Sequence, residues 1–247
     1  MEQDKKATHI TINALLRMKT NLSPLMRMLQ LADSAFPVGA FSFSNGLESA
    51  VHTGVVYDAR TLQAYTRTIA LQAAFTDGVA ALHSLRSAQR KEYEGILQAD
   101  RSLHQLKLNN EARTMQQRMG RKLAELGVHL FACDTMERWL ADVKEGITPG
   151  NYPVAQGILF ASLGLNEDIL YTAHQYGVIS MVLNAALRCL KVSHYDTQRI
   201  LYQLSDESLQ WLPEIRYMAL EDMNNFNPQA DILASLHEKG AMRMFMN

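Results

Sequence analysis

Apolar residues recur along most of the chain at intervals of three and four positions, which is the spacing of one face of an α-helix. No stretch shows the strict alternation of apolar and polar residues that is typical of a half-buried strand. Asp58 suits the cap of a helix and no proline follows until Pro149, so a succession of helices is expected between them. Breaks are predicted near Asp77 and Gly78, near Glu94 and Gly95 or Asn109 and Asn110, and at Gly127.

The start of the chain combines a predicted helix with an apolar loop. Ser23 followed by Pro24 suits the cap and first turn of a helix, because proline has no N–H group to leave unpaired. The next segment, 35–43, contains Pro37 and Gly39, which forbid a regular helix, yet it is strongly apolar. Since a buried loop needs partners for its backbone groups, this loop either packs under its own bundle or lines a protein interface.

A short helix is expected after this loop. Asn45 and Glu48 have capping-box spacing, and Gly54 suits the end of the helix that they open. In the first turn of that helix the Glu48 carboxylate would stabilise the helix dipole by about 0.3 to 1 kcal/mol. This structural role competes with any functional role of Glu48.

Two windows, 146–166 and 169–187, carry no charged residue. The helices expected in them, over 154–163 and 166–190, are apolar nearly all round and are therefore expected at the centre of a bundle. Further helices are expected around them over 111–126, 128–144, 196–206, 208–223 with an interruption or kink at Pro213, and 229–244. We predict an all-α fold, a single-domain helical bundle of about ten helices with a central pair of apolar helices. The domain is predicted to span 23–247, and 1–22 to be a flexible N-terminal tail.

Composition narrows the possible partners. The chain has 247 residues, 47% of them hydrophobic, and 24 Lys and Arg against 25 Asp and Glu, which leaves a formal charge of −1. This balance gives no electrostatic reason to bind nucleic acid, and no segment is apolar enough to span a membrane, so neither partner is expected. Cys133 and Cys189 stand far apart outside any CxxC motif, which favours a reducing, cytoplasmic location.

The sequence shows no complete catalytic or metal-binding motif. A glycine-rich loop followed by Lys and Ser or Thr, as phosphate binding needs, is missing. Ser44 has Gly46 after it but lacks the preceding glycine of a hydrolase nucleophile elbow. His237 and Glu238 resemble the start of a zinc-protease helix, but Ala241 stands where the second histidine is needed. We therefore predict neither a catalytic residue nor a tightly bound metal ion.

Several segments together resemble the urease accessory protein UreF family. Residues 29–48 (LQLADSAFPVGAFSFSNGLE) are similar to the family hallmark, in which a Pro-x-Gly turn and an aromatic, serine-rich strip precede Gly-Leu-Glu. Residues 110–123 (NEARTMQQRMGRKL) and 152–165 are similar to two further family segments. The end of the chain matches the family pattern at Pro228, Asp231, Ile232, His237, Glu238, Arg243 and Phe245.

This resemblance implies an all-α, homodimeric, cytoplasmic protein that is not an enzyme. It implies a bridge between UreD, called UreH in some organisms, and the GTPase UreG, in a complex that loads nickel onto apo-urease. The chain would orient the GTPase so that GTP hydrolysis is coupled to nickel release. It would hold no permanent cofactor, and nickel would only pass transiently through a water-filled passage.

The resemblance also gives candidate residues for partner binding or nickel passage. They are Pro37, Gly39, Phe41, Ser44, Gly46, Glu48, Arg113, Arg188, Gln198, His237, Glu238, Arg243 and Phe245. The chain departs from the family pattern at two places. Asn151 or Tyr152 stands where the family often has a histidine, and KVSHYD at 191–196 replaces a Pro-Leu-Gly-Gln type of turn.

The last five residues, 243–247, would ordinarily form a frayed terminus. They contain Arg243 and Phe245, and Arg and aromatic residues dominate the energetics of interfaces. We expect this segment to dock in or near 37–48 and to help recruit the partners.

Two alternatives belong to other classes of protein. A helical-bundle enzyme would hold an internal metal or cofactor with His83, His129, His174 or His237 and nearby acids. It needs two ligands at a spacing of three or four residues, and no pair of histidines offers that. A generic dimeric adaptor unrelated to nickel is the second alternative, and the hallmark at 37–48 argues against it.

Overall fold

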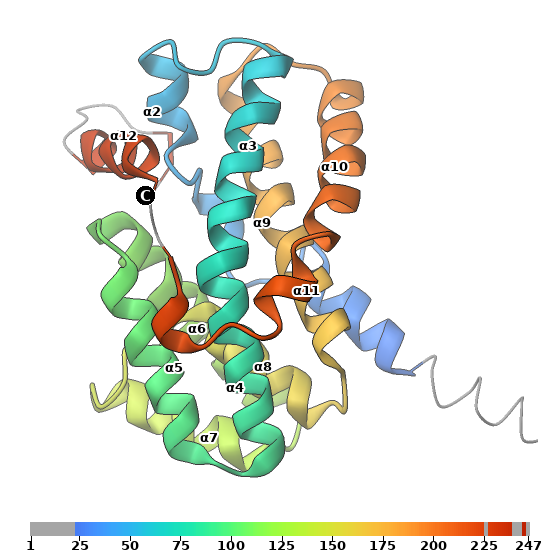
Figure 1. Ribbon diagram of the computed structural model, residues 1–247, viewed down its shortest axis with the longest axis vertical. Helices are drawn as coiled ribbons and strands as arrows, with labels where there is room; N and C mark the ends of the chain where they lie inside the picture. Colours follow the sequence, from blue (N-terminus) through green and yellow to red (C-terminus); the bar gives the residue numbers. More distant parts are fainter. Residues whose placement is uncertain (1–22, 225–226, 239–243, 246–247) are drawn as a thin grey trace, which may run out of the picture.

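The computed structural model describes residues 23–224, 227–238, 244 and 245, without the side chains of 236–238. A helix over 23–32 is followed by α2 (Leu47–His52), α3 (Ala59–Ala73), α4 (Val79–Arg90), α5 (Tyr93–Leu106), α6 (Asn110–Leu130), α7 (Asp134–Lys144), α8 (Tyr152–Ser162), α9 (Glu167–Cys189), α10 (His194–Leu209), α11 (Leu212–Ile215) and α12 (Pro228–Glu238) (Figure 1). No strand occurs in this part of the chain. The predicted all-α, single-domain bundle is confirmed.

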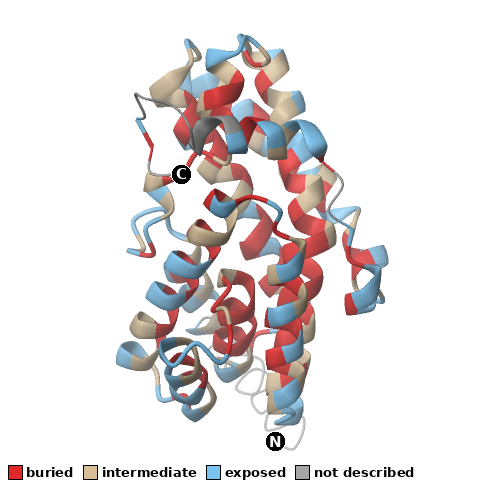
Figure 2. Cartoon of the chain, turned by 90° about the vertical axis from the view of Figure 1, so that its left-hand side faces the viewer, coloured by how far each residue is buried: buried red, intermediate tan, exposed pale blue. Residues whose placement is uncertain are grey.

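The helices pack in two groups, one around α8 and one around α9 (Figure 1). Helix α8 packs mainly against α4 and α6, with Ile158 and Phe160 fully buried. Helix α9 packs mainly against α3 and α10, with Ile179 and Val182 fully buried. Buried residues follow the inward sides of the helices along the whole molecule (Figure 2). The two apolar segments are therefore central, but they pack on these neighbours more than on each other.

A π-helical turn, η2 (Ala74–Gly78), joins α3 to α4, so these helices form one continuous column (Figure 1). The break predicted near Asp77 and Gly78 is thus a widened turn and not a loop. Gly78 lies close to the Tyr171 ring, at 3.4 Å from the position that a Cβ atom would take. The widened turn directs Asp77 inward, where its side chain is buried. Such turns often occur where a helix serves a site.

A buried carboxylate fixes the turn that precedes α8. Asp100 of α5 accepts hydrogen bonds from Thr148 Oγ1 (2.8 Å) and from the backbone N–H groups of Gly150 and Asn151 (both 2.9 Å). The amide Nδ2 of Asn151 donates to the same carboxylate at 2.6 Å. Asn151, which departs from the family pattern, therefore stabilises the fold at this position.

The second departure from the family pattern, at 191–196, opens α10. Ser193 accepts from the backbone N–H of Asp196 at 3.1 Å, and Asp196 accepts in return from the backbone N–H of Ser193 at 3.1 Å. This reciprocal pair is a capping box, so the segment starts a helix without the proline and glycine of the family turn.

Two predictions about glycine and capping positions were wrong. Helix α6 continues through Gly127 to Leu130. A Cβ atom added at Gly127 would lie 3.6 Å from the Leu159 side chain and 3.7 Å from the Met136 side chain, so the helix packs closely against α8 and α7 at this glycine. This packing keeps the segment helical. The expected capping box at Asn45 is absent. Asn45 and Gly46 both have positive φ, so Gly46 occupies the cap position and makes no side-chain cap.

Near the end of the bundle, an interruption or kink at Pro213 was expected within 208–223. The structure shows an interruption: α10 runs on to Leu209, and Pro213 lies in the first turn of the short α11. Proline suits a first helical turn, so it starts a helix here instead of kinking one. Helix α12 is described over Pro228–Glu238, and residues 239–243, into which the predicted helix continued, lie outside the described residues.

No helix in the described residues has the length and apolar character that crossing a membrane requires.

Candidate functional site

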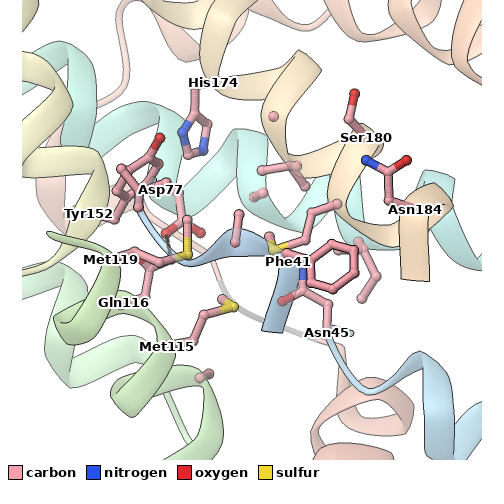
Figure 3. A pocket seen from close by; sticks show the side chains of 18 of the residues that line it. Phe41, Asn45, Asp77, Met115, Gln116, Met119, Tyr152, His174, Ser180 and Asn184 are labelled. Carbon is pink, nitrogen blue, oxygen red and sulfur yellow. Dashed lines mark hydrogen bonds between the residues drawn. The ribbon is translucent and has the colours of Figure 1, made fainter. Parts of the chain in front are cut away.

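A cavity of about 180 Å³ lies beside the apolar loop. Residues from 31–46 and from α3, α6, α9 and α12 line it. Figure 3 shows Asp77, Gln116, Tyr152 and His174 at one end, and Phe41, Asn45, Ser180 and Asn184 toward the other. Most of the wall between them is apolar, with Phe36, Val38, Ile69, Met115, Met119 and Met181.

The polar end of the cavity is built around the Asp77 carboxylate. Lys107 Nζ donates to Asp77 Oδ2 at 2.6 Å, and Gln116 Nε2 donates to Asp77 Oδ1 at 2.7 Å. The hydroxyl of Thr76 adds a third hydrogen bond at 3.0 Å. Lys107 and Asp77 are both buried, so each charge depends on the other for compensation.

His174 of α9 reaches the same end of the cavity. Its Nδ1 atom lies 2.8 Å from Gln156 Oε1, and Gln156 Nε2 donates to the hydroxyl of Tyr152 at 3.2 Å. A carbonyl oxygen only accepts, so Nδ1 carries the hydrogen and Nε2 is an acceptor. Burial lowers the pKa of His174 to about 4 from its ordinary value of 6.5, so the ring is neutral at pH 7.

Arg188 forms the opposite rim, where its guanidinium lies between two aromatic rings. The Cζ atom is 3.9 Å from the centroids of both Phe41 and Phe245. Its Nη2 atom also donates to the backbone carbonyl of Phe41 at 2.7 Å. The short 3-10 turn η1 (Ala40–Ser42), which follows Gly39 at φ +88°, presents Phe41 outward with 69% of its surface exposed.

Glu48 holds the end of the chain against this rim. Its carboxylate accepts the backbone N–H of Met244 at 2.8 Å and that of Phe245 at 3.2 Å. The Phe245 side chain is only 3% exposed. The expected contact between the end of the chain and 37–48 is thus present for these two residues, and its part in recruiting partners stays a proposal.

Gly46 shows why this corner of the chain needs glycine. Its φ is +76°, and an added Cβ atom would lie 3.0 Å from the hydroxyl oxygen of Tyr65. That hydroxyl donates to the carbonyl of Asn45 at 2.7 Å, which fixes the turn. Ser44 beside it is fully buried. These two predicted residues therefore shape the start of α2.

The other predicted residues are scattered. Pro37 and Gly39 lie on the exposed side of the loop, and Arg113 donates to the carbonyl of Lys107 at 2.7 Å. Gln198 is exposed on α10 and does not line the cavity. For His237 and Glu238 the structure gives only their place at the end of α12, and Arg243 lies outside the described residues. The structure thus gathers Phe41, Gly46, Glu48, Arg188 and Phe245 at one corner.

Sequence reasoning missed the polar end of the cavity. Asp77 was noted only as a helix break, and Lys107, Gln116 and Gln156 were not singled out. Their one visible signal is polarity at positions where helical spacing predicts burial, as for His174 inside an uncharged segment. The contacts join α6, α8, α9 and the π-helical turn, so no local pattern could reveal them.

The described residues contain no group of three His, Cys, Asp or Glu side chains that could hold a metal ion. Cys133 and Cys189 are free thiols. Burial, with the Glu48 carboxylate nearby, raises the pKa of Cys189 to about 11, so this thiol is protonated at pH 7 and is a weak nucleophile.

The described residues form an all-α bundle, the class of fold predicted from the sequence, and Phe41 and Arg188 stack on each other at one corner of it. Comparison with known proteins specifies the family. The UreF family model matches residues 56–205. The chain belongs to the UreF family of urease accessory proteins, which are non-catalytic maturation factors.

Individual relatives are similar in sequence to this chain over almost its whole length. Urease accessory protein UreF of Yersinia pseudotuberculosis serotype IB (strain PB1/+) is 39% identical over 227 residues, which is 92% of this chain and all of the relative. The protein of the same name from Yersinia enterocolitica serotype O:8 is 40% identical over the same lengths. A match of this length necessarily includes η1 and α2 as well as the central helices.

Proposed function

We propose that this chain is a scaffold that bridges UreD, or UreH, and the GTPase UreG during urease maturation, so that nickel reaches apo-urease. Its own part is to bind and orient proteins, and it holds the GTPase where GTP hydrolysis can be coupled to nickel release. The chain acts in the cytoplasm, in keeping with its two free thiols, and as a homodimer.

The surface formed by Phe41, Arg188, Phe245 and Glu48 is the observation that carries this proposal. We call these four residues the aromatic corner. Phe41 is a large apolar side chain that is held outward by a cation–π contact and a backbone hydrogen bond. An ordered, exposed aromatic side chain backed by arginine has the composition of an interface hot spot.

Nickel is cargo in this proposal and not a resident cofactor. Glu48 contributes a carboxylate to the aromatic corner, and the cavity that Phe41 and Arg188 of the same corner line has room and polar groups for water. These two features support a transient passage of the ion through the complex, with Glu48 as an oxygen ligand near the partner surface.

Co-purification tests the bridging role. Affinity-tagged chain would be co-expressed with UreD and UreG of the same source, as wild type, as Phe41→Ser and as Tyr202→Ser. Tyr202 is an equally exposed aromatic residue on α10 and serves as the matched control. We expect wild type and Tyr202→Ser to retain both partners and Phe41→Ser to lose at least one. Full retention by Phe41→Ser would contradict the role of the aromatic corner, and absence of both partners from wild type would contradict the bridge.

A further inference from the structure

The polar end of the cavity contains two acceptor atoms that no described residue satisfies. Gln116 Nε2 donates to Asp77, which leaves Gln116 Oε1 without a partner. His174 Nδ1 donates to Gln156, which leaves His174 Nε2 without a partner. Both side chains are more than nine-tenths buried and both line the cavity (Figure 3). An unsatisfied buried acceptor is costly, so this arrangement calls for a ligand that donates hydrogen bonds.

The same end of the cavity also offers a donor. Lys107 lines the cavity, and its ammonium group carries three N–H donors, of which one is directed to Asp77 at 2.6 Å. Lys107 Nζ and the Gln116 amide bind the two oxygens of one carboxylate, so they are close neighbours. The Asp77–Lys107 pair has no net charge, and Glu111 and Asp231 also line the cavity. The Lys107 ammonium disfavours a cation and the carboxyl groups disfavour an anion, so a neutral ligand fits better than an ion.

The wall next to these groups is apolar. Met115 and Met119 lie beside Gln116 on α6, and Met181 faces the cavity from α9. Methionine side chains adapt to ligands of differing shape. A ligand that fits here has a small apolar body and a neutral head with two donors and one acceptor.

We propose that the cavity binds a small neutral primary carboxamide. The two hydrogens of its NH₂ group donate to Gln116 Oε1 and His174 Nε2, its carbonyl oxygen accepts from Lys107 Nζ, and its alkyl part packs on Met115 and Met119. Water satisfies the same acceptors but leaves the methionine wall without contacts. This inference concerns the isolated chain and does not depend on the partners proposed above.

Methyl NMR of protein labelled at its methionine methyl groups tests the proposal. Butyramide and 2-pentanone would be titrated separately, because they have nearly the same shape and differ in the replacement of NH₂ by CH₃. We expect butyramide to shift the Met115 and Met119 signals saturably, and 2-pentanone to bind about tenfold more weakly, since it leaves both acceptors unpaired. No saturable shift up to about 0.1 M butyramide would mean that the cavity holds only water. Equal affinity for the two compounds would mean that it is only an apolar pocket. Either result would overturn the proposal.

Two glutamine variants on α6 sharpen this test. Gln116→Met removes the acceptor at nearly constant shape, and Gln117→Met makes the same change at an exposed neighbouring position. We expect Gln116→Met to lose the preference for butyramide and Gln117→Met to keep it. An unchanged preference in Gln116→Met would contradict the assigned contact. If Gln116→Met does not fold, His174→Phe is used in its place. It removes the other acceptor, so the preference for butyramide should again be lost.

Discussion

The Glu48 carboxylate accepts a hydrogen bond from the backbone N–H of Phe245 at 3.2 Å, although 197 residues separate the two along the chain. Together with the bond to Met244, this contact ties the end of the chain to the first turn of α2. Arg188 completes the arrangement by stacking on Phe245 and on Phe41. From the sequence alone, residues at the end of a chain are expected to be frayed. Here Met244 and Phe245 are instead part of the region that we assign to partner binding.

Removal of the Glu48 carboxylate should release the end of the chain. In Glu48→Ala the amides of Met244 and Phe245 lose their acceptor, and a hydrogen bond to a charged group contributes about 1.5 kcal/mol or more. We expect hydrogen exchange at these two amides to accelerate by about tenfold or more, with the core amides unchanged. Glu92→Ala, a change at an exposed glutamate, is the control. Unchanged protection in Glu48→Ala would show that other contacts hold the segment.

Lys107→Met should destabilise the fold severely. The variant leaves the Asp77 charge buried without its cation, and breaking a buried ion pair in this way costs about 3 to 5 kcal/mol. The double variant Asp77→Asn/Lys107→Met, which removes both charges, should recover much of this loss. Urea unfolding monitored by circular dichroism measures both free energies. A single variant as stable as wild type would contradict the assignment of a compensated buried pair.

The buried His174 predicts a pH dependence of stability. The unfolded chain takes up a proton at this residue below about pH 6.5, whereas the folded chain does so only near pH 4, because burial lowers its pKa. The stability from neutral His174 is complete above pH 6.5 and declines as the pH falls toward 4, by about 3 kcal/mol in all. The difference in unfolding free energy between wild type and His174→Gln should follow this decline. A difference that stays constant from pH 7.5 to 4.5 would contradict it.

Two helical glycines should respond oppositely to alanine. An added Cβ at Gly120 would overlap the carbonyl oxygen of Gly150 and lie 2.8 Å from the backbone nitrogen of Tyr152, so Gly120→Ala forces α6 away from the turn before α8. We expect a loss of about 3 kcal/mol or more. Gly177 in α9 has nothing within 4 Å of an added Cβ, so Gly177→Ala should gain about 0.4 to 1 kcal/mol. Equal effects of the two changes on the melting temperature would contradict this packing.

The helices were predictable because their signals are local. The segments that became α8 and α9 are apolar nearly all round over 11 and 23 residues, a pattern that indicates buried helices, and tertiary packing then buries them. Gly127 misled the prediction because glycine both ends helices and fits within them, and packing against Leu159 decides the case here. At Pro213 the pattern left an interruption or a kink open, and the place of this proline in the first turn of α11 gives the interruption.

The candidate site was only partly predictable, for a related reason. Phe41, Glu48 and Phe245 were found through family resemblance, and their mutual contacts depend on a chain end that no periodicity describes. Asp77, Lys107 and His174 meet because a π-helical turn, the end of α5 and the middle of α9 converge. A pattern read along one helix carries no information about that convergence.

The nickel content of urease provides the most direct test of the central claim, that this chain works by presenting a protein-binding surface. Cells that carry the urease genes but lack this chain would be complemented with wild type or with Phe41→Ser, and the purified urease would be analysed for bound nickel. We predict full loading with wild type and nearly apo-urease with Phe41→Ser, at equal levels of folded chain. Normal loading with Phe41→Ser, or equal loading in cells that lack the chain, would contradict the account.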